Sequence, residues 1–328
     1  MNIVSLSVCQ QVPPLVNFQT ALAMEPFFRH PPKDKAVVIL GATGTGKSRL
    51  AIDLATSFPP AEIVNSDKMQ VYRGLDITTN KVTEEECRGV QHHLLGIADP
   101  NSNFTAVDFT RHASSAIDSI VRRDRLPIIA GGSNSYIEAL IEDDAAFRLK
   151  YECFFLWVDV SLPVLDSFLS KRVDRMIKAG QVDEVRQFFD PAGDYTTGIR
   201  RAIGVPEFDE FLRTEATADE GTKKRLLEAA IAKIKANNCS LARRQIQKIH
   251  RLYNMWKRNA YRLDATEVFT KSGDDAEELW ETHVLAKSQR IVRKFLHNDG
   301  PMVPPASAMS SVPLYPQAKQ VAMATASH

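Results

Sequence analysis

The chain has 328 residues, which is enough for one large α/β domain with a sizeable core and a small appendage. Its 41 Lys and Arg residues almost balance 40 Asp and Glu residues, which excludes a protein that binds polyanions over its whole surface. No apolar run reaches the length of a membrane span, so we expect no membrane partner. The four cysteines form no CxxC pair, which predicts reduced thiols and neither a zinc module nor a disulfide framework.

The two ends of the chain differ from its middle. Residues 1–28 contain one acidic residue, Glu25, and no Lys or Arg. We predict a flexible leader or an organelle transit segment over residues 1–34, because transit segments are poor in acids, although most are also rich in Arg and Ser. Residues 299–328 are rich in Pro, Ala, Ser and Met, and we predict a disordered tail there. The folded domain is therefore expected over residues 35–298.

Four apolar runs predict a parallel sheet. Residues 36–40 (AVVIL) are continuously apolar, as is typical of a strand buried on both faces. Further strands are predicted in AEIVNSD (61–67), LPIIAGG (126–132) and FFLWVDV (154–160), each followed by a turn and a helical pattern. We predict an α/β fold with a P-loop NTPase-like parallel sheet flanked by helices, and a small helical subdomain at roughly 185–235. Ligands of such sheets bind at the carboxyl ends of the strands.

The sequence GATGTGKS (41–48) matches the phosphate-binding loop GxxxxGK[ST]. Gly41, Gly44 and Gly46 let the backbone point several N–H groups at one anion, and the following helix adds its positive end. Lys47 supplies a mobile cation, and the Ser48 hydroxyl is placed to ligate Mg²⁺, the cofactor that we expect. The alternative is a chance match in a Gly-rich turn, against which the preceding strand and the following helix argue.

Two further segments follow predicted strands. We expect the second strand beside the first, so that Asp67 faces the phosphate loop and can ligate Mg²⁺ through water or accept a proton from a nucleophile. The alternative is that Ser66 and Asp67 cap a helix. The third strand ends in Gly131 and Gly132, where the Ser133 hydroxyl could bind a second ligand, with an ordinary tight turn as the alternative.

Seven motifs in a fixed order resemble the isopentenyltransferases, which comprise tRNA dimethylallyltransferases and the adenylate isopentenyltransferases of plant cytokinin synthesis. They span about residues 35–298 and read GATGTGKS, NSDKMQVYRGLDI, QHHLL, GGSNSY, RVDRMIKAG, RRAIGVPEF and ARRQ. The resemblance implies that the loop holds the diphosphate of dimethylallyl diphosphate. The N6 amine of adenine would attack the carbon that bears this diphosphate, which leaves without any phosphoryl transfer.

The resemblance also implies roles for single residues. Lys47, the loop amides and Mg²⁺ on Ser48 would stabilise the departing diphosphate. Thr43 would donate to the bridging oxygen, and Asp67 would accept the proton of the amine. The tRNA enzymes have a Thr-Arg-Gln run where this chain has NCS (238–240), so either Arg243 or Arg244 would replace the Arg of that run. The substrate-binding residues implied are Gly41, Gly44, Gly46, Ser48, Ser66, Gln70, Ser133, Arg172 and Arg244, with Arg175 a further candidate.

Three features favour a free adenine nucleotide over tRNA as the acceptor. Only residues 137–153, which are short and acidic, stand where the tRNA enzymes would carry a long helical RNA clamp. No cysteine follows Cys239, so the Cys2His2 finger of nuclear-type tRNA enzymes is missing. Residues 223–262 contain twelve Lys or Arg and one acid, Glu228. Arg244, Lys248 and Arg251 share one face of a helix, which favours the phosphate tail of ATP or ADP over that of AMP.

The sequence therefore predicts an adenylate dimethylallyltransferase that acts on ATP or ADP, with AMP left open, in the first step of cytokinin synthesis. The alternatives are a tRNA dimethylallyltransferase and a P-loop small-molecule kinase. We expect dimethylallyl diphosphate and an adenine nucleotide as partners, no stable nucleic-acid partner, a monomer, and a plastid location with cytoplasm or mitochondrion as alternatives. His92 and His93 are expected to be positioning or core histidines, and Tyr253 and Trp256 to be packing residues.

Overall fold

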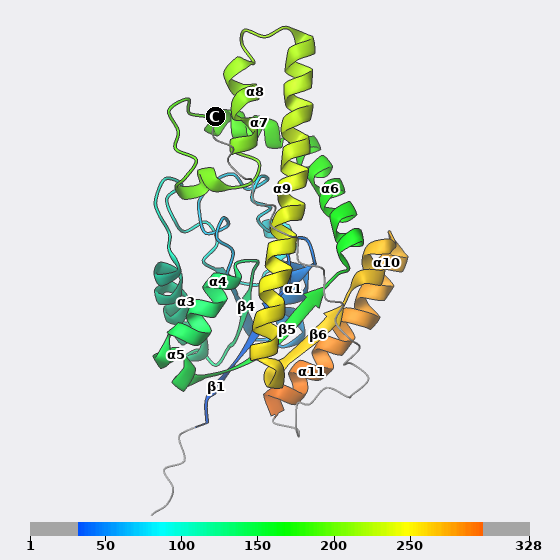
Figure 1. Ribbon diagram of the computed structural model, residues 1–328. Helices are drawn as coiled ribbons and strands as arrows, with labels where there is room; N and C mark the ends of the chain where they lie inside the picture. The colour runs from blue at the N-terminus through cyan, green and yellow to red at the C-terminus, as the bar shows by residue number, and fades with distance from the viewer. Residues whose placement is uncertain (1–31, 298–328) are drawn as a thin grey trace, which may run out of the picture. The chain divides into compact units, whose positions relative to one another are not determined.

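The computed structural model describes residues 32–297, so most of the predicted leader and all of the predicted tail lie outside the described residues. The described chain forms a six-stranded sheet with helices on both faces (Figure 1). All five pairings between neighbouring strands are parallel. Within residues 32–297, no helix combines the length and the apolar character that a membrane span requires.

The strand order corrects one prediction. The order is β3-β2-β4-β1-β5-β6, so β4 lies between β1 and β2, and the expectation that the second strand pairs with the first is wrong. The four predicted strands are present, whereas the sequence analysis missed two short, half-exposed strands whose apolar signal is weak. The strands are β1 (Asp34–Leu40), β2 (Ala61–Asn65), β3 (His92–His93), β4 (Leu126–Ala130), β5 (Tyr151–Asp159) and β6 (Ala260–Asp264).

The central strand β1 contributes to the hydrophobic core on both faces of the sheet. Residues 36–40 are fully buried, as their continuous apolar run predicts. Val38 packs in one core cluster with Phe109 of α3 (Ala106–Val121), and Val37 packs in the other cluster with Leu50 of α1 (Lys47–Ser57). Successive side chains of a strand point to opposite faces, so each helix layer receives alternate residues of β1.

The remaining helices cover the sheet and extend beyond it. Figure 1 shows α7, α8 and the first part of the long helix α9 standing away from the strands, in the range that the sequence predicts for a helical subdomain. The helices are α2 (Glu84–Cys87), α4 (Asn134–Glu138), α5 (Ala145–Lys150), α6 (Leu162–Lys178), α7 (Gln181–Phe188), α8 (Asp209–Thr214), α9 (Glu220–Met255), α10 (Asp274–Leu279) and α11 (Ala286–His297).

Helix α9 carries both core and cleft residues. Its buried positions recur every three or four residues, as one face of a helix requires. Trp256, which follows α9, stacks on Phe155 at 4.2 Å between ring centroids, and Tyr253 lies 5.3 Å from Trp157, so the packing role predicted for both is confirmed. The buried residues of α9 are Ala230, Ile234, Asn238, Ala242, Ile246, Ile249 and Leu252.

A buried carboxylate on β2 links the sheet to the turn that follows helix α3. Glu62 on β2 is 0% exposed and accepts hydrogen bonds from Arg123 (2.6 and 2.9 Å), Arg125 (2.8 Å) and His93 (2.6 Å). Burial alone would raise the pKa of Glu62, but the hydrogen bonds from Arg123 and His93 hold it below its usual value. This positioning role of His93 agrees with the prediction. Separately, the described residues contain no group of three or more His, Cys, Asp or Glu that could hold a metal ion.

We expect Glu62→Gln to lower the free energy of unfolding by about 2–3 kcal/mol at pH 7, because two arginines lose their carboxylate. Since the folded-state pKa lies below the ordinary 4.5, the stabilisation is fully present above the unfolded-state pKa and is lost as the pH falls through the folded-state value. Urea unfolding from pH 7 to pH 3 should show the gap to wild type closing below about pH 4.5. The exposed Glu210→Gln is the control, and a gap that stays constant with pH would contradict the assignment.

Candidate active site

A cleft of about 1260 Å³ opens at the carboxyl ends of the central strands. The loops that follow β1, β2 and β4 supply Thr43, Asp67 and Ser133 to its wall, and helices α6 and α9 supply Arg172 and Gln245. The cleft thus lies where a parallel α/β sheet places its ligands. It brings together most of the residues that the sequence predicts for the site.

The phosphate loop begins directly after β1. A Cβ on Gly41 would lie 2.5 Å from Thr45 Oγ1, so Gly41 serves the tight turn beneath the loop and does not line the cleft. Gly44 and Gly46 line the cleft with φ angles of 84° and 91°, in the left-handed region that favours glycine. Ser48, on the first turn of α1, exposes its side chain in the cleft wall.

Lys47 is a buried cation at the base of the loop. It is 8% exposed, and its Nζ donates a hydrogen bond of 2.6 Å to the carbonyl oxygen of Ala42. Burial lowers its pKa to about 8, while nearby Asp67 raises it and Arg172 lowers it further. Burial also lowers the pKa of Arg172 to about 10. Both cations are desolvated, and an anion bound in the loop would compensate for that loss.

Thr43 and Arg172 form a connected pair in the wall. The Arg172 guanidinium donates to Thr43 Oγ1 and to Asn238 Oδ1, both at 3.1 Å. Asn238 is the first residue of the NCS run, and this hydrogen bond orients Arg172. The sequence left open whether Arg243 or Arg244 takes the place of the Arg of the tRNA enzymes. In the structure Arg244 lines the cleft, whereas Arg243 pairs with Asp166.

Asp67 performs two roles, one with each carboxylate oxygen. Its Oδ1 accepts hydrogen bonds from the backbone N–H groups of Met69 (2.9 Å) and Gln70 (3.3 Å) and so closes a turn, whereas the predicted alternative was the cap of a helix, and no helix begins here. Its Oδ2 faces the cleft, where a Cβ on Gly132 would lie 3.4 Å from it. Gln70 lines the cleft, but its side-chain amide donates to the backbone carbonyls of Thr79 and Asn80 and so holds the loop there.

The two predicted serines differ in position. Ser133 lines the cleft, and its Oγ accepts a hydrogen bond from the backbone N–H of Lys68 at 2.8 Å. Ser66 is fully buried, and its side chain lies where Gly131 approaches it so closely that a Cβ would be 2.5 Å from the hydroxyl. The predicted substrate contact of Ser66 is therefore wrong, because this side chain does not reach the cleft.

Gln245 links the two glycine loops and was not assigned a role from the sequence. Its Oε1 accepts from the backbone N–H of Thr43 at 2.8 Å, and its Nε2 donates to the carbonyl oxygen of Gly132 at 2.7 Å. One side chain thereby fixes the phosphate loop relative to the Gly131–Gly132 loop. In the sequence, the position of Gln245 at the end of the ARRQ motif could have indicated that it has a role in the site.

Cations gather on the Ser133 side of the cleft. Lys68, Arg201, Arg244 and Lys248 line it, and we call these four residues the basic group. Burial lowers the pKa of Lys68, and the neighbouring charges of Arg201 and Lys248 lower it further. Lys68 and Arg201 were not predicted, because they lie in separate segments that only the fold brings together.

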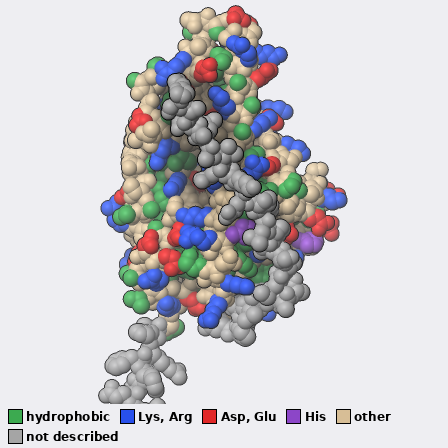
Figure 2. Space-filling model, viewed as in Figure 1, with side chains coloured by type: hydrophobic (Ala, Val, Ile, Leu, Met, Phe, Trp, Pro, Cys, Tyr) green, Lys and Arg blue, Asp and Glu red, His purple; other side chains and the backbone are tan. Residues whose placement is uncertain are grey.

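The basic residues of 223–262 do not all lie near the cleft. Lys223 lies 21 residues before Arg244 on one helix, about 32 Å away at 1.5 Å per residue, and its Nζ pairs with Glu220. Figure 2 shows basic and acidic side chains interspersed over this face of the molecule. Six of the twelve basic residues in 223–262 form ion pairs: Lys223, Lys235, Arg243, Lys248, Arg251 and Arg262.

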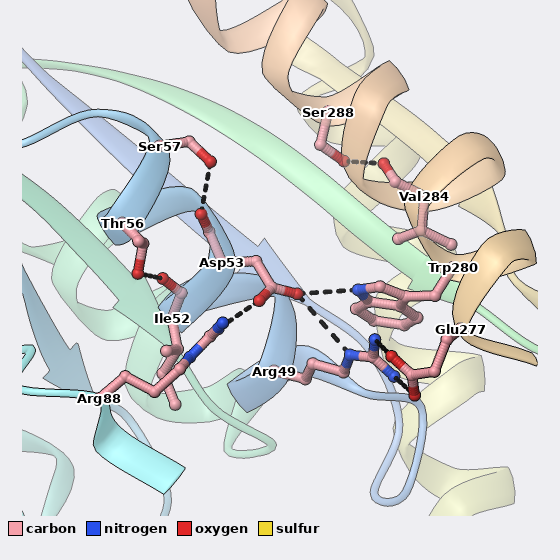
Figure 3. Close-up of polar contacts among 10 residues, drawn as sticks. All are labelled: Arg49, Ile52, Asp53, Thr56, Ser57, Arg88, Glu277, Trp280, Val284 and Ser288. Atoms are coloured by element: carbon pink, nitrogen blue, oxygen red, sulfur yellow. Dashed lines mark hydrogen bonds and ion pairs between the residues drawn. The ribbon is translucent and has the colours of Figure 1, made fainter. Parts of the chain in front are cut away.

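A second buried carboxylate, Asp53, holds the Trp280 ring against the phosphate loop. Asp53 on α1 accepts a hydrogen bond of 2.8 Å from Trp280 Nε1 and pairs with Arg88 and Arg49 (Figure 3). The Trp280 ring lies against the loop, since a Cβ on Gly46 would be 2.8 Å from it. This contact fixes the C-terminal segment to the loop.

The comparisons with known proteins agree with this geometry. The family model for IPP transferase matches residues 70–150 and 142–251. The chain is 60% identical to adenylate isopentenyltransferase 5, chloroplastic, of Arabidopsis thaliana over 93% of this chain and 95% of the relative. It is 53% identical to adenylate isopentenyltransferase 7, mitochondrial, of the same plant over 90% of this chain and 91% of the relative. The chain belongs to the IPP transferase family.

Two solved structures share the fold. A eukaryotic dimethylallyltransferase acting on tRNA matches with a TM-score of 0.71 and 25% identity over 83% of this chain and 82% of that chain. The full-length tRNA isopentenylpyrophosphate transferase of Bacillus halodurans matches with a TM-score of 0.63 and 26% identity over 81% of this chain and 100% of that chain.

We expect Gln245→Ala to weaken the binding of inorganic diphosphate by about tenfold, because the two loops lose their link and the amides around the anion are less preorganised. Calorimetric titration measures this affinity. Gln247→Ala, an exposed position on the same helix, is the matched control. Equal affinity in the Gln245 variant and wild type would show that the bridge does not position the loop.

Proposed function

We propose that this protein is an adenylate isopentenyltransferase, which transfers the dimethylallyl group of dimethylallyl diphosphate to the N6 amine of ATP or ADP and releases diphosphate. The observation that carries this proposal is that Asp67 Oδ2 faces the same cleft as the phosphate loop. A carboxylate beside the loop suits an acceptor that loses a proton. The relatives named adenylate isopentenyltransferase support the choice of acceptor class, and family membership argues against a kinase.

The chemistry follows from the residues of the cleft. The donor diphosphate binds to the loop amides, Lys47 and Arg172, whose charges stabilise it as it leaves. The N6 amine attacks the carbon that bears the diphosphate; a C–N bond forms and the C–O bond breaks. Asp67 accepts the amine proton as the nitrogen becomes positive. Thr43, whose hydroxyl accepts from Arg172, can direct its own proton to the leaving oxygen.

Mg²⁺ is part of the proposal. The described residues offer no cluster of three or more metal-binding side chains, which suits an ion held mainly by substrate phosphate oxygens, as Mg²⁺ commonly is. The Ser48 hydroxyl is exposed in the cleft and would supply one ligand, with Asp67 in contact through water. The ion would neutralise charge on the departing diphosphate. Loss of turnover with EDTA and its recovery with Mg²⁺ test this.

We further propose that the acceptor's phosphate tail binds to the basic group, which lies on the Ser133 side of the cleft. A tail of two or three phosphates would contact more of these four cations than the single phosphate of AMP. No stable nucleic-acid partner is proposed, and the tRNA dimethylallyltransferase activity named for the solved structures is the alternative. We also propose a monomer, because one chain supplies every group of the cleft. We propose a plastid location, because the relative at 60% identity is named chloroplastic, with the mitochondrion, named for the relative at 53% identity, as an alternative.

We expect Asp67→Asn to lower turnover by about 10² or more, in the usual range for a general base. The amide can still accept the backbone hydrogen bonds of Met69 and Gln70, so the fold and the binding of dimethylallyl diphosphate should persist. Steady-state rates and donor titration measure the two effects. Near-normal turnover would refute the assignment of the base.

Incubation with Mg²⁺, dimethylallyl diphosphate and each acceptor separates the two branches of the family. We expect N6-prenylated product from ATP and ADP, less from AMP, and essentially none from an anticodon stem-loop. Mass spectrometry of the product measures this. Comparable rates on the stem-loop and on ATP would replace the proposal with the tRNA activity.

The basic group can be tested by comparing acceptors. We expect Lys68→Ala and Lys248→Ala each to lower kcat/KM for ATP by about tenfold, because each variant loses one charge-assisted hydrogen bond to the outer phosphates. The kcat/KM for AMP should change much less. Lys223→Ala, at the far end of α9, is the control and should leave both values unchanged. Equal losses for ATP and AMP would exclude the basic group as the site of the outer phosphates.

A further inference from the structure

The phosphate loop is held at two points by side chains from distant parts of the chain. Near its start, Gln245 accepts a hydrogen bond from the backbone N–H of Thr43 at 2.8 Å. Near its end, the Trp280 ring lies so close to Gly46 that a Cβ there would be 2.8 Å from the ring. Both contacts restrict the backbone whose N–H groups bind an anion.

Trp280 is almost fully buried, although it borders the cleft. It is 2% exposed, and its ring packs in the same core cluster as Leu50 and Leu54 of α1. It begins a π-helical turn (Trp280–Leu285) between α10 and α11, and such turns are rare and occur frequently at functional sites. Gly46 directly precedes α1 with a φ of 91°. The ring therefore contacts the residue at which the loop becomes the helix.

A buried carboxylate sets the orientation of the indole. Asp53 is 8% exposed, and its Oδ2 accepts a hydrogen bond of 2.8 Å from Trp280 Nε1 (Figure 3). Arg88 pairs with the other carboxylate oxygen, and Arg49 Nε lies 3.7 Å from Oδ2. The Arg49 guanidinium also lies 4.5 Å from the centre of the Trp280 ring, which adds a cation–π contact. These partners fix the carboxylate, and the carboxylate fixes the ring.

Charge and position predict opposite effects of Asp53 on an anion in the loop. Its negative charge opposes the attraction of Arg49, which lines the cleft. Through the ring, by contrast, Asp53 fixes Gly46, so the loop loses less freedom when an anion binds. Arg49 and its partner Glu277 are 39% and 64% exposed, so solvent screens the effect of charge. The hydrogen bond to Trp280 is buried, and position therefore outweighs charge.

We propose that Asp53 and Trp280 are positioning residues of the diphosphate site: Asp53 orients the indole ring, and the ring fixes the loop at Gly46. The inference rests on the proposed function only in assigning the loop to the donor diphosphate. Neither side chain has to touch the substrate. The C-terminal segment is thereby part of the donor site, although Trp280 follows Asp53 by 227 residues.

The first test neutralises the carboxylate. We expect Asp53→Asn to weaken the binding of inorganic diphosphate by about fivefold, because an amide has one oxygen and cannot accept from both the indole and Arg88. Calorimetric titration of the full chain measures this. Glu62→Gln is the matched control, since it also removes a buried carboxylate that pairs with two arginines, Arg123 and Arg125, but lies outside the cleft. Its affinity should equal that of wild type. Tighter or unchanged binding in Asp53→Asn would overturn the proposal.

The second test keeps the charge unchanged. Trp280→Phe removes the indole N–H and retains an aromatic ring, and we expect diphosphate affinity to fall by about fivefold. The KM for dimethylallyl diphosphate should rise to match, while the KM for the nucleotide stays constant. The matched control is Trp256→Phe, because Trp256 Nε1 also donates to a carboxylate, that of Glu142, outside the cleft.

The two tryptophan variants separate positioning from a loss of folded protein. Both lose one indole hydrogen bond to a carboxylate, and a purely structural role would lower the active fraction without changing the donor KM. Diphosphate should also change the tryptophan fluorescence of wild type and of Trp256→Phe, but not that of Trp280→Phe, because Trp280 adjoins the loop. A wild-type donor KM in Trp280→Phe, or a fluorescence change that persists in it, would refute the role of the ring.

The titrations also distinguish this inference from the proposed function. If diphosphate binds to wild type and more weakly to both variants, but no adenine nucleotide is prenylated, the proposed acceptor is wrong and the positioning roles stand. If prenylation proceeds with the same donor KM in wild type, Asp53→Asn and Trp280→Phe, the proposed function stands and the positioning roles are wrong.

Discussion

The burial of β1 on both faces is the constraint on which the site depends. A strand without a polar face must lie inside a parallel sheet covered by helices on both sides, and here β4 and β5 flank it. The carboxyl ends of β1, β4 and β2 then meet at one edge. The phosphate loop, the Gly131–Gly132 loop and the turn at Asp67 are thereby brought into one cleft, although β2 is not the neighbour of β1.

Helix α9 forms one wall of the cleft at this edge of the sheet. Its core face buries Ala242 and Ile246 beneath the sheet edge, and the residues between them, Arg244 and Gln245, reach the cleft. The helix is 36 residues long, so its first part leaves the sheet and its charges there cannot act on the cleft. Position along the helix, and not the number of basic residues, decides which cations meet a ligand.

Desolvated cations give the cleft its preference for anions. Lys47 and Arg172 are held in the wall with lowered pKa values because burial opposes their charge. Each is oriented by a neutral group, the Ala42 carbonyl and the Asn238 amide oxygen, which offers no opposing charge. Asp67 is the nearby opposing charge that raises both pKa values, and a bound diphosphate would add to it.

The sequence by itself determined the elements that local physics controls. The apolar run 36–40, the glycines of the loop and the motif order predicted the fold class and the family correctly, because strand burial and loop curvature are local properties of residue type. Only the tertiary structure decided the rest. It placed β4 between β1 and β2, buried Ser66 beneath Gly131, paired Lys223 with Glu220, and joined Gln245 to two loops more than a hundred residues away. Strand order, burial and ion pairing depend on contacts between distant segments, which no residue type or spacing specifies alone.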